Sequence, residues 1–432
     1  TIYYYRAFVI YNDEPVYSDI AQFKTRNNDN GTESSPLIIE SETDWGEFVA
    51  AIQNGAGSGA DAAGDYKGSE IVDGALGMYF KIGNDFTLTS SNITVNGFKG
   101  ILLGDGKTIT LDNSAGYGTD FKGLFSTIYN ATIDSLNVLV AQSITIPSPE
   151  TVDNNGFGLL CSEAYSSSVI SNCTLSGGEN ILLNCNEVRF GASALVGSVN
   201  NSTITKCTNN LDVDGYYVAG IAGLMKGGTI SNCTNNAAIK SESDGYYVAG
   251  IVYSIEGNEQ STITECLNAG DLNSGGIAGG IVAYITGGNA TISKCMNIGK
   301  ITTSHTDLSI GEYAGGIVAR IGGVNPTITN NANYGSFNKL SSNLGGITGS
   351  NVSSLSKNVV APVYLSENIT GNSTRNIFAT MAVSVESYET PKEEDDDFFD
   401  EQIGDIKVDS LRLRFVSHAT PMQTNDMVGS AL

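Results

Sequence analysis

Two acidic turns in the middle of the chain hold the carboxylates best placed to bind a ligand. Asp212 and Asp214 precede one GYYVAGI string, and Glu242 and Asp244 precede an identical second copy. D-x-D-G is part of the pattern of calcium-binding loops, in which carboxylate and carbonyl oxygens hold the cation. The full calcium-loop patterns are absent, and later repeats do not keep the carboxylates. We interpret the four residues as candidate ligand-binding positions in solvated turns, and we expect no metal site and no cofactor.

The same carboxylates could act on a glycosidic bond. Glycoside hydrolysis needs two carboxyl groups about 5–5.5 or 6.5–9.5 Å apart, and we expect Asp212 and Glu242 to lie one repeat apart. Basic residues are scarce among the repeats, and no cluster of Arg, Lys and Asp recurs at one position. The chain has only two histidines, His305 and His418, and no H-E-x-x-H zinc-peptidase motif. These observations favour a protein without enzymatic activity; a polysaccharide-active glycosidase or lyase is the alternative.

Tyr216 and Tyr246 are the aromatic candidates for binding, because they occupy equivalent positions in the two identical strings. If Ile221 points into the protein, the alternation of a β-strand places Tyr217 inward and Tyr216 outward. The same argument places Tyr247 inward and Tyr246 outward. Exposed tyrosine rings can pack against sugar rings or protein surfaces, and packing beneath a corner loop would explain the same pattern.

These residues belong to a repeat that runs through most of the chain. One ladder has the pattern small-Gly-Ile/Leu, with spacings of 26, 30, 30, 36 and 30 residues. Its apolar residues are Leu195, Ile221, Ile251, Ile281, Ile317 and Ile347. The second ladder has the pattern T-I-S/T-x-C-x-N. Its pairs are Ile170/Cys173, Ile204/Cys207, Ile230/Cys233, Ile263/Cys266 and Ile292/Cys295, followed by Ile328 with Asn331 in place of Cys.

A unit of about 30 residues with short strands cannot bury its own apolar face, and stacking of successive units buries it. Each strand would pair in parallel with its copy in the next coil at about 4.8 Å. Ile then lies on Ile in the interior, Cys residues fill small buried positions, and Asn side chains form ladders between coils. We predict an all-β protein, a parallel β-helix or β-solenoid of about eight to ten coils.

A short helix is expected before the repeats. Ser41–Asn54 places Trp45, Phe48, Val49 and Ile52 on one apolar face. Because an exposed solenoid end invites pairing with other strand edges, we predict that this helix caps the N-terminal end.

The remaining segments complete the predicted domain organisation. Residues 1–26 contain two expected strands around a turn, residues 27–36 form a polar linker, and residues 37–385 hold the repeats. Residues 386–432 form an acidic tail without assignment, in which Ser410–Val416 alternates like a strand.

The first 26 residues resemble the end of a fibronectin type III domain. The resemblance rests on the strings Y-Y-x-R-A-x-V and x-Y-S-x-x-x-x-F-x-T, which match the last two strands of that family. It implies that these strands are the remnant of a truncated β-sandwich.

From about Leu37 to Ser350 the chain resembles bacterial surface proteins that carry the GLUG motif. The resemblance rests on the GG-I-x-G cores, the T-I-S-x-C-x-N strands and the segments DWGEFVAAIQNG, MYFKIGNDF and FKGILLGDGKTITL. It implies a secreted or surface-anchored protein, often described as an adhesin. The motif also occurs in non-catalytic parts of some IgA-specific metallopeptidases.

The charge balance restricts the partners. The chain has 22 Lys+Arg against 46 Asp+Glu, a net charge of −24, which disfavours nucleic acid and anionic membrane surfaces. No stretch approaches the ~20 apolar residues of a membrane-spanning helix, so we expect no membrane insertion. With the repeat and the resemblances, this indicates a non-catalytic adhesion or stalk module at the bacterial cell surface or outside the cell. We expect a host glycan or an extracellular protein as its partner.

Overall fold

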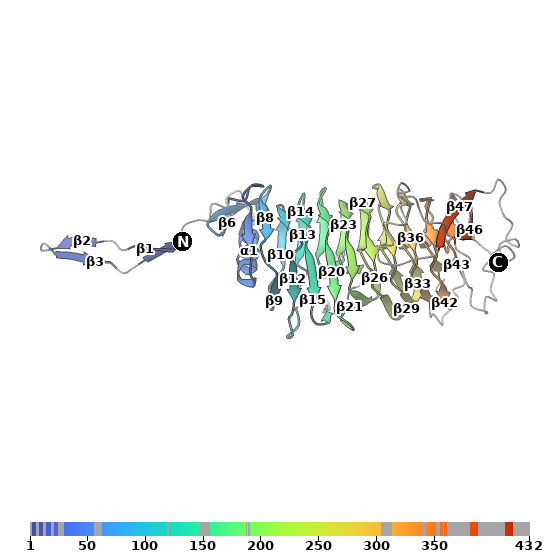
Figure 1. Cartoon of the computed structure of the whole chain (residues 1–432), viewed down its shortest axis with the longest axis horizontal. Coiled ribbons are helices and arrows are strands. Elements are labelled where there is room, and N and C mark those ends of the chain that lie inside the picture. Colours follow the sequence, from blue (N-terminus) through green and yellow to red (C-terminus); the bar gives the residue numbers. More distant parts are fainter. Residues whose placement is uncertain are drawn as a thin grey trace.

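The chain winds into an elongated coil of parallel β-strands, seen from the side in Figure 1. The computed structural model describes residues 30–55, 63–118, 121–146, 156–186, 188, 191–303, 313–338, 343–350, 355–356 and 358–360, and short strand segments nearer both ends. Three sheets of 17, 10 and 12 strands run along the coil. We call them the first, second and third sheets. The predicted all-β parallel solenoid is confirmed.

The first sheet holds two strand positions of each coil. Its strands are β5 (Leu37–Ile39), β8 (Tyr79–Ile82), β10 (Val95–Phe98), β11 (Ile101–Leu103), β13 (Phe125–Tyr129), β14 (Thr132–Asp134), β18 (Cys161–Tyr165), β19 (Val169–Ser171), β23 (Val196–Thr205), β27 (Ala222–Ser231), β30 (Val252–Ile255), β31 (Ser261–Thr264), β34 (Val282–Ile285), β35 (Ala290–Ser293), β39 (Val318–Ile321), β40 (Thr327–Thr329) and β44 (Leu355–Ser356). In β23 and β27 the two positions merge into one long strand.

The second sheet has one strand per coil. Its strands are β9 (Phe86–Leu88), β12 (Thr108–Leu111), β15 (Asn137–Val140), β20 (Thr174–Gly177), β24 (Thr208–Asn210), β28 (Thr234–Asn235), β32 (Leu267–Asn268), β36 (Met296–Asn297), β41 (Ala332–Asn333) and β45 (Val359–Val360). These ten strands agree with the predicted number of coils.

The third sheet closes each coil. Its strands are β16 (Ile144–Thr145), β17 (Phe157–Gly158), β21 (Leu182–Cys185), β22 (Ala192–Ser193), β25 (Asp212–Gly215), β26 (Tyr217–Ala219), β29 (Ile239–Ala249), β33 (Leu272–Gly279), β37 (Ile301–Thr303), β38 (Tyr313–Gly315), β42 (Phe337–Asn338) and β43 (Asn343–Gly345).

Two rows of aliphatic side chains line the interior in the predicted register. Ile204 pairs with Ile230, which in turn pairs with Ile263, and Ile292 and Ile328 continue the row. The second row, from Leu195 to Ile347, is also fully buried. Each such side chain contributes roughly 1.5–3 kcal/mol when removed from water, so the stacked coils are stabilised mainly by this interior.

A ladder of buried asparagines joins five coils. The side-chain Nδ2 of each donates to Oδ1 of the next at 2.8 Å, in the order Asn209, Asn235, Asn268, Asn297 and Asn333. The first four also donate to the backbone carbonyl two residues ahead, at 2.9–3.1 Å. All five are fully buried, and buried amides are costly unless they are hydrogen-bonded. The predicted asparagine ladder is confirmed.

A row of glycines packs directly against this ladder. A Cβ atom on Gly250 would lie 2.4 Å from the Cγ atom of Asn268, and one on Gly280 would lie 1.9 Å from the carbonyl oxygen of Gly316. The corner between the third and first sheets therefore requires glycine because the backbones approach closely.

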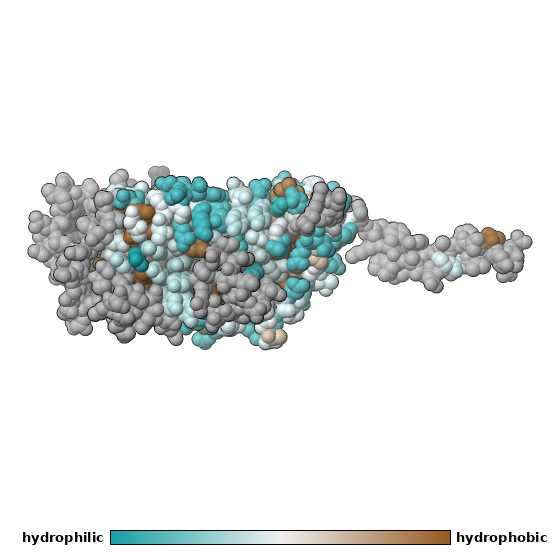
Figure 2. Space-filling view, turned by 180° about the vertical axis from the view of Figure 1, so that it is seen from behind, coloured by the Kyte–Doolittle hydropathy of each residue, from teal (hydrophilic) through white to brown (hydrophobic). Residues whose placement is uncertain are grey.

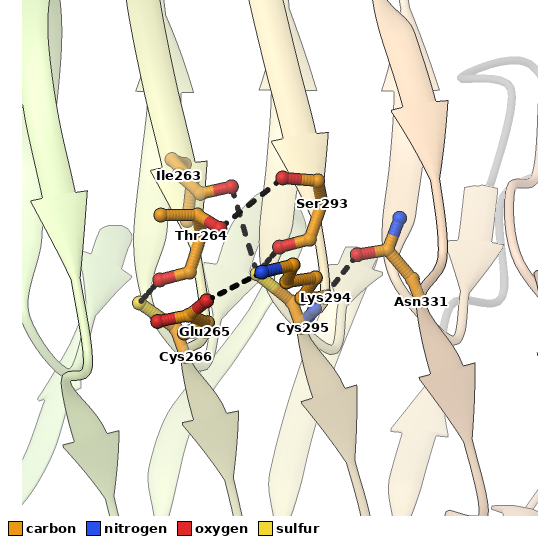
Figure 3. Close-up of polar contacts among 8 residues, drawn as sticks. All are labelled: Ile263, Thr264, Glu265, Cys266, Ser293, Lys294, Cys295 and Asn331. Carbon is orange, nitrogen blue, oxygen red and sulfur yellow. Dashed lines mark hydrogen bonds and ion pairs between the residues drawn. The ribbon is translucent and has the colours of Figure 1, made fainter. Parts of the chain in front are cut away.

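The row of cysteines is buried in the same interior. The thiols of Cys207, Cys233, Cys266 and Cys295 each lie 3.7 Å from an isoleucine carbonyl oxygen of the preceding coil. Beyond Cys295, Asn331 takes the equivalent position. Its Oδ1 accepts a hydrogen bond from the backbone N–H of Cys295 at 2.9 Å (Figure 3), and its Nδ2 donates to the carbonyl of Ile292 at 3.0 Å.

A left-handed residue precedes each of these positions and turns the chain from the first sheet to the second. Its φ is between 52° and 56° in the six coils with Asn172, Lys206, Asn232, Glu265, Lys294 and Asn330. Asn tolerates this conformation better than other non-glycine residues. Where Glu265 and Lys294 occupy it, the half-buried carboxylate of Glu265 and the exposed amine of Lys294 form an ion pair at 2.9 Å (Figure 3).

The helix α1 (Glu42–Gly55) confirms the predicted helix and lies at the N-terminal end of the coil (Figure 1). Trp45 donates from Nε1 to the carbonyl of Ile93 at 2.8 Å. The Phe48 ring lies 4.8 Å from that of Phe80, and the backbone N–H of Asp44 is capped by Ser41 Oγ at 3.2 Å. The apolar face of the helix thus covers the interior of the first coils.

Smaller elements accompany the coil. The antiparallel strands β6 (Ala63–Tyr66) and β7 (Ser69–Val72) are followed by the short 3-10 helix η1 (Asp73–Ala75). Part of the predicted linker contacts the first coil, because the backbone N–H of Tyr79 donates to the carbonyl of Gly31 at 2.8 Å.

Antiparallel strands lie nearer the two ends of the chain. The predicted N-terminal hairpin is formed by β2 (Phe8–Tyr11) with β3 (Glu14–Tyr17), continued by β1 (Ile2–Tyr5) with β4 (Ala21–Lys24). The predicted strand near residue 411 is β47 (Leu411–Ser417), which pairs with β46 (Met381–Ser387). The acidic run of residues 389–401 lies outside the described residues, and the domain boundaries stay predictions.

Replacing Asn268 by Ala should destabilise the protein strongly. The change removes one member of the ladder and leaves the buried amide of Asn235 and the buried Oδ1 of Asn297 without their partners. We expect the free energy of unfolding, measured by denaturant titration, to fall by roughly 2–4 kcal/mol. Asn273→Ala, at an exposed position of the same coil, should change it by less than about 0.5 kcal/mol. Equal effects of the two changes would contradict the role of the ladder.

Gly280→Ala should be similarly harmful. Its Cβ would collide with a backbone carbonyl and lie 2.7 Å from Asn297, and such overpacking costs roughly 1–3 kcal/mol or more. Gly288→Ala is the matched control, because nothing lies within 4 Å of a Cβ at that position. The midpoints of thermal unfolding should separate the two variants. If Gly280→Ala unfolds at the same temperature as the wild type, the inference that this corner tolerates only glycine is wrong.

Candidate ligand-binding site

Asp212 has a structural contact that its sequence context did not indicate. Its side chain is exposed at the start of β25, and its Oδ1 accepts a hydrogen bond from the backbone N–H of Ala238 in the next coil at 2.9 Å. Asp271 makes the equivalent contact with the backbone N–H of Lys300, also at 2.9 Å. The carboxylate at this corner therefore links successive coils.

The register of the third sheet separates the two acidic turns. Val213 pairs with Ile239 and Asp214 with Lys240, and Lys240 Nζ lies 3.6 Å from Asp214 Oδ2. The expectation that Asp212 and Glu242 lie one repeat apart on the same row is wrong, because inward-facing Val213 and Ile239 set the pairing.

Glu242 and Asp244 fall where β29 and β33 lose their regular pairing. Register shifts occur between Ser241 and Asp244 and between Asp244 and Tyr247. These acidic residues thus belong to an insertion that the first GYYVAGI copy lacks. Their side chains lie outside the described residues, and their assignment as ligand-binding positions stays a prediction. Among the described residues, no group of three or more His, Cys, Asp or Glu is arranged to hold a metal ion.

The predicted orientation of the tyrosines is only half correct. Val218, next to Tyr217, lies in the main interior of the coil, whereas the half-buried Tyr217 ring lies outside it. The prediction that Tyr217 and Tyr247 point inward is therefore wrong. The strand ends at Ala219, and the turn at Gly220 interrupts the alternation that was counted back from Ile221.

Tyr216 and Tyr246 form a stacked pair on successive coils. Their ring centroids are 4.3 Å apart and their planes differ by 16°. Tyr217 meets Tyr246 edge-on at 5.3 Å. The register pairs Tyr247 with Ile277 in the next coil. Gly276, the residue before Ile277, has no side chain with which to continue the row of stacked rings.

The pair continues into a larger group of tyrosines around the same corner. Tyr217 lies 5.3 Å from Tyr253, and Tyr247 lies 5.7 Å from both Tyr253 and Tyr284. Burial, with the neighbouring tyrosines, raises the pKa of Tyr253 well above its usual range. We call the set Tyr216, Tyr217, Tyr246, Tyr247, Tyr253, Tyr284, Tyr313 and Arg320 the tyrosine cluster.

Arg320 completes this cluster at its C-terminal side. Its Nη1 donates to the hydroxyl of Tyr247 at 3.1 Å. Its guanidinium carbon lies 5.0 Å from the ring centroid of Tyr284 and 5.4 Å from that of Tyr313. Two cation–π contacts and one hydrogen bond thus hold the only arginine among the described coil residues against three tyrosines.

Small residues form the base on which the cluster packs. Tyr247, Tyr253 and Tyr313 pack against a separate apolar cluster whose members are Ala219, Ala249, Ile277, Ala283 and Ala319. These residues come from strands on both sides of the glycine corner. All the side chains of the tyrosine cluster remain half-buried, so parts of them face solvent.

Sequence reasoning found Tyr216 and Tyr246 but missed Tyr253, Tyr284 and Arg320 as members of the same site. Tyr284 and Arg320 occupy one row of the first sheet, since they pair with each other in register. Aligning the positions just after the isoleucine ladder would have placed these two residues on one row. Their contacts with Tyr247 cross the corner, however, and reach over one coil for Tyr284 and two coils for Arg320.

Among the coloured residues in Figure 2, hydrophilic and near-neutral ones predominate. Hydrophobic colour appears there only in small, separate areas among the residues that are not grey. Among the described residues, no helix is long and apolar enough to cross a membrane.

Comparison with known proteins assigns the chain to no family. No family model matches the chain, and no curated protein matches it. A crystal structure from Bacteroides ovatus, provisionally described as an immunoglobulin A1 protease, is similar to it with a TM-score of 0.45. The two chains are 18% identical over 70% of this chain and 86% of that chain. At this level the likeness carries no argument about this chain.

The native protein should resist thiol reagents. Burial raises the pKa of Cys207, Cys233 and Cys266 well above the usual value, so the nucleophilic thiolate does not form at pH 8. All seven cysteines are buried and free of disulfides. Labelling with an aromatic disulfide reagent at pH 8 should modify none of them in native protein and all seven in denaturant. Rapid labelling of the native protein would contradict their role as interior fillers.

Proposed function

We propose that this protein is a non-catalytic binding module that holds carbohydrate on its tyrosine cluster. The observation that carries the proposal is the stacked pair of Tyr216 and Tyr246, two half-buried rings on successive coils. A sugar ring can pack its apolar face against an aromatic ring that no other side chain covers. The half-buried neighbours Tyr217 and Tyr247 add hydroxyl groups that can hydrogen-bond to sugar hydroxyls.

The solenoid supports binding because it is rigid. All members of the tyrosine cluster except Tyr216 lie on strands that pair with neighbouring coils, and sites on strands are held more firmly than sites on loops. The tyrosines therefore need little ordering when a ligand arrives, which reduces the entropic cost of binding.

The enzyme alternative has weaker support. Of the four acidic candidates, Asp212 holds a backbone N–H of the next coil and Asp214 lies beside Lys240. A pair of carboxylates facing one another across a bound sugar, as glycoside hydrolysis needs, does not arise from these two.

The cellular setting follows from the resemblance of the repeats to GLUG-motif surface proteins. On this ground we place the module at the bacterial cell surface or outside the cell, with a host glycan as its partner. The net charge of −24 disfavours nucleic acid and anionic membranes as alternatives. An extracellular protein is the other partner that the tyrosine cluster could accept.

Binding to an array of glycans and mucin-type proteins, with each bound compound assayed for turnover, tests this function. We expect binding without turnover, and we expect Tyr246→Ala to weaken it about tenfold or more, since one aromatic stacking partner is typically worth 1–3 kcal/mol to a ligand ring. Tyr129→Ala is the matched control. Tyr129 also stacks on a tyrosine of the next coil, Tyr165, with rings 5.3 Å apart, but away from the cluster on β13.

Turnover of a bound glycan would overthrow the proposal and return attention to Glu242 and Asp244. Binding to proteins but to no glycan would show that the partner is an extracellular protein and not a carbohydrate. Equal loss in both tyrosine variants would show that the site is elsewhere.

A further inference from the structure

Arg320 has a setting that differs from that of the other basic residues of the coil. The ion pairs among the described residues all use lysines: Lys67, Lys81, Lys99, Lys240 and Lys294. Arg320 instead lies among aromatic rings, and no described carboxylate is within ion-pair distance of it. This is a half-buried positive charge on a chain of net charge −24.

The contacts of the guanidinium fix its position but use only part of its hydrogen-bonding capacity. The rings of Tyr284 and Tyr313 lie 5.0 and 5.4 Å from its carbon atom, and Tyr247 accepts one hydrogen bond at 3.1 Å. A guanidinium has five N–H donors in a planar fork, and a carboxylate can accept two of them in parallel. Because three tyrosines already orient the side chain, little further ordering is needed to receive an anion.

The surroundings suit an anion that is part of a sugar. The tyrosine cluster is continuous from Tyr216 to Arg320, since Tyr217 contacts Tyr246, Tyr247 and Tyr253, and Tyr247 contacts Arg320. Aromatic faces and hydroxyls fit a sugar ring, and the fork of Arg320 fits its carboxylate. A free inorganic anion would bind to the arginine without contacting the tyrosine rings.

Building on the proposed carbohydrate-binding function, we infer that the module recognises acidic glycans, with Arg320 binding the carboxylate of a sialic or uronic acid residue. Tyr284 and Tyr313 position the guanidinium, and Tyr247 holds it by the hydrogen bond to its hydroxyl. The stacked pair of Tyr216 and Tyr246 then receives a neighbouring sugar of the same chain.

The test compares acidic sugars with neutral copies of the same shape. The probes are a sialylated trisaccharide and a galacturonate trimer, each beside its carboxyl-reduced form, and affinity is measured by titration calorimetry on the full chain. Wild-type protein should bind at least one acidic probe about tenfold or more tightly than its reduced form. Raising the salt concentration should weaken only the acidic complex, because the charge pair is screened.

Variants assign the effect to the arginine. R320Q should lower the affinity for the acidic probe about tenfold and change that for the reduced form less than twofold. R320K keeps the charge without the planar fork and should fall between R320Q and wild type. K206Q removes one exposed positive charge directly after β23, in the turn from the first sheet to the second, and should leave both affinities unchanged. Circular dichroism and the unfolding midpoint confirm the fold of each variant, and R320K decides if R320Q does not fold.

The outcomes separate this inference from the function on which it rests. Equal binding of acidic and reduced probes, weakened by Tyr246→Ala but not by R320Q, overturns the role of Arg320 and leaves carbohydrate binding intact. Binding that R320Q abolishes but Tyr246→Ala does not touch supports the role of Arg320 and removes the stacked pair from the site. If none of these probes binds while neutral glycans on the array do, the acidic specificity is wrong. If no glycan binds at all, both proposals are wrong.

Discussion

The close packing of the asparagine ladder against the glycine corner is the constraint on which the rest of the solenoid depends. Each of these asparagines is hydrogen-bonded to its copy in the next coil at 2.8 Å, so slipping one coil by a residue would leave buried amides without partners. The glycines opposite them leave room for nothing larger than hydrogen. Together these rows fix both the register between coils and the thickness of the coil. Insertions are therefore confined to the corners. Even across the longest spacing, from Ile281 to Ile317, the backbone N–H of Ile281 still donates to the carbonyl of Ile317 at 2.9 Å.

The candidate site is a consequence of that register. Two identical strings of sequence, locked one coil apart, bring Tyr216 onto Tyr246 and Tyr217 onto Tyr247. The same register aligns Tyr284 with Arg320 on the neighbouring sheet. Because the corner between the two sheets is built from small residues, the outward side chains of both sheets reach one another. Arg320 can thus donate to Tyr247, which is 73 residues earlier in the chain.

What the sequence could predict depends on whether a feature repeats locally. The isoleucine and asparagine rows, the buried cysteines and the helix α1 were predictable, because each follows from periodicity within one coil or from identical residues in successive coils. The inward orientation assigned to Tyr217 failed because alternation holds only within a strand, and Gly220 ends that strand. The pairing of Asp212 with Glu242 failed because interior Val213 and Ile239 set the register, and the insertion before Tyr247 carries Glu242 out of it. The contacts of Arg320 could not be found from spacing, since they cross a corner whose angle no local pattern encodes.

The inner and outer rows of one strand are under different physical demands, and this explains how a repeat can carry a site. The inner row of β30, β34 and β39 keeps a valine in each coil, Val252, Val282 and Val318. Two residues later, the paired positions are Ser254, Tyr284 and Arg320. Ser254 is buried there, whereas Tyr284 and Arg320 are half-buried and partly face solvent. Changing an outward residue alters neither the aliphatic interior nor the asparagine ladder, so its effect on folding is small compared with that of an interior change. The backbone thus presents a series of equivalent positions about 4.8 Å apart, on which different side chains can be placed without disturbing the coil. Under the proposed function, a chain of sugar residues would contact such a surface at several positions of fixed spacing. The arginine of one coil and the tyrosines of neighbouring coils would then together determine which sugar binds.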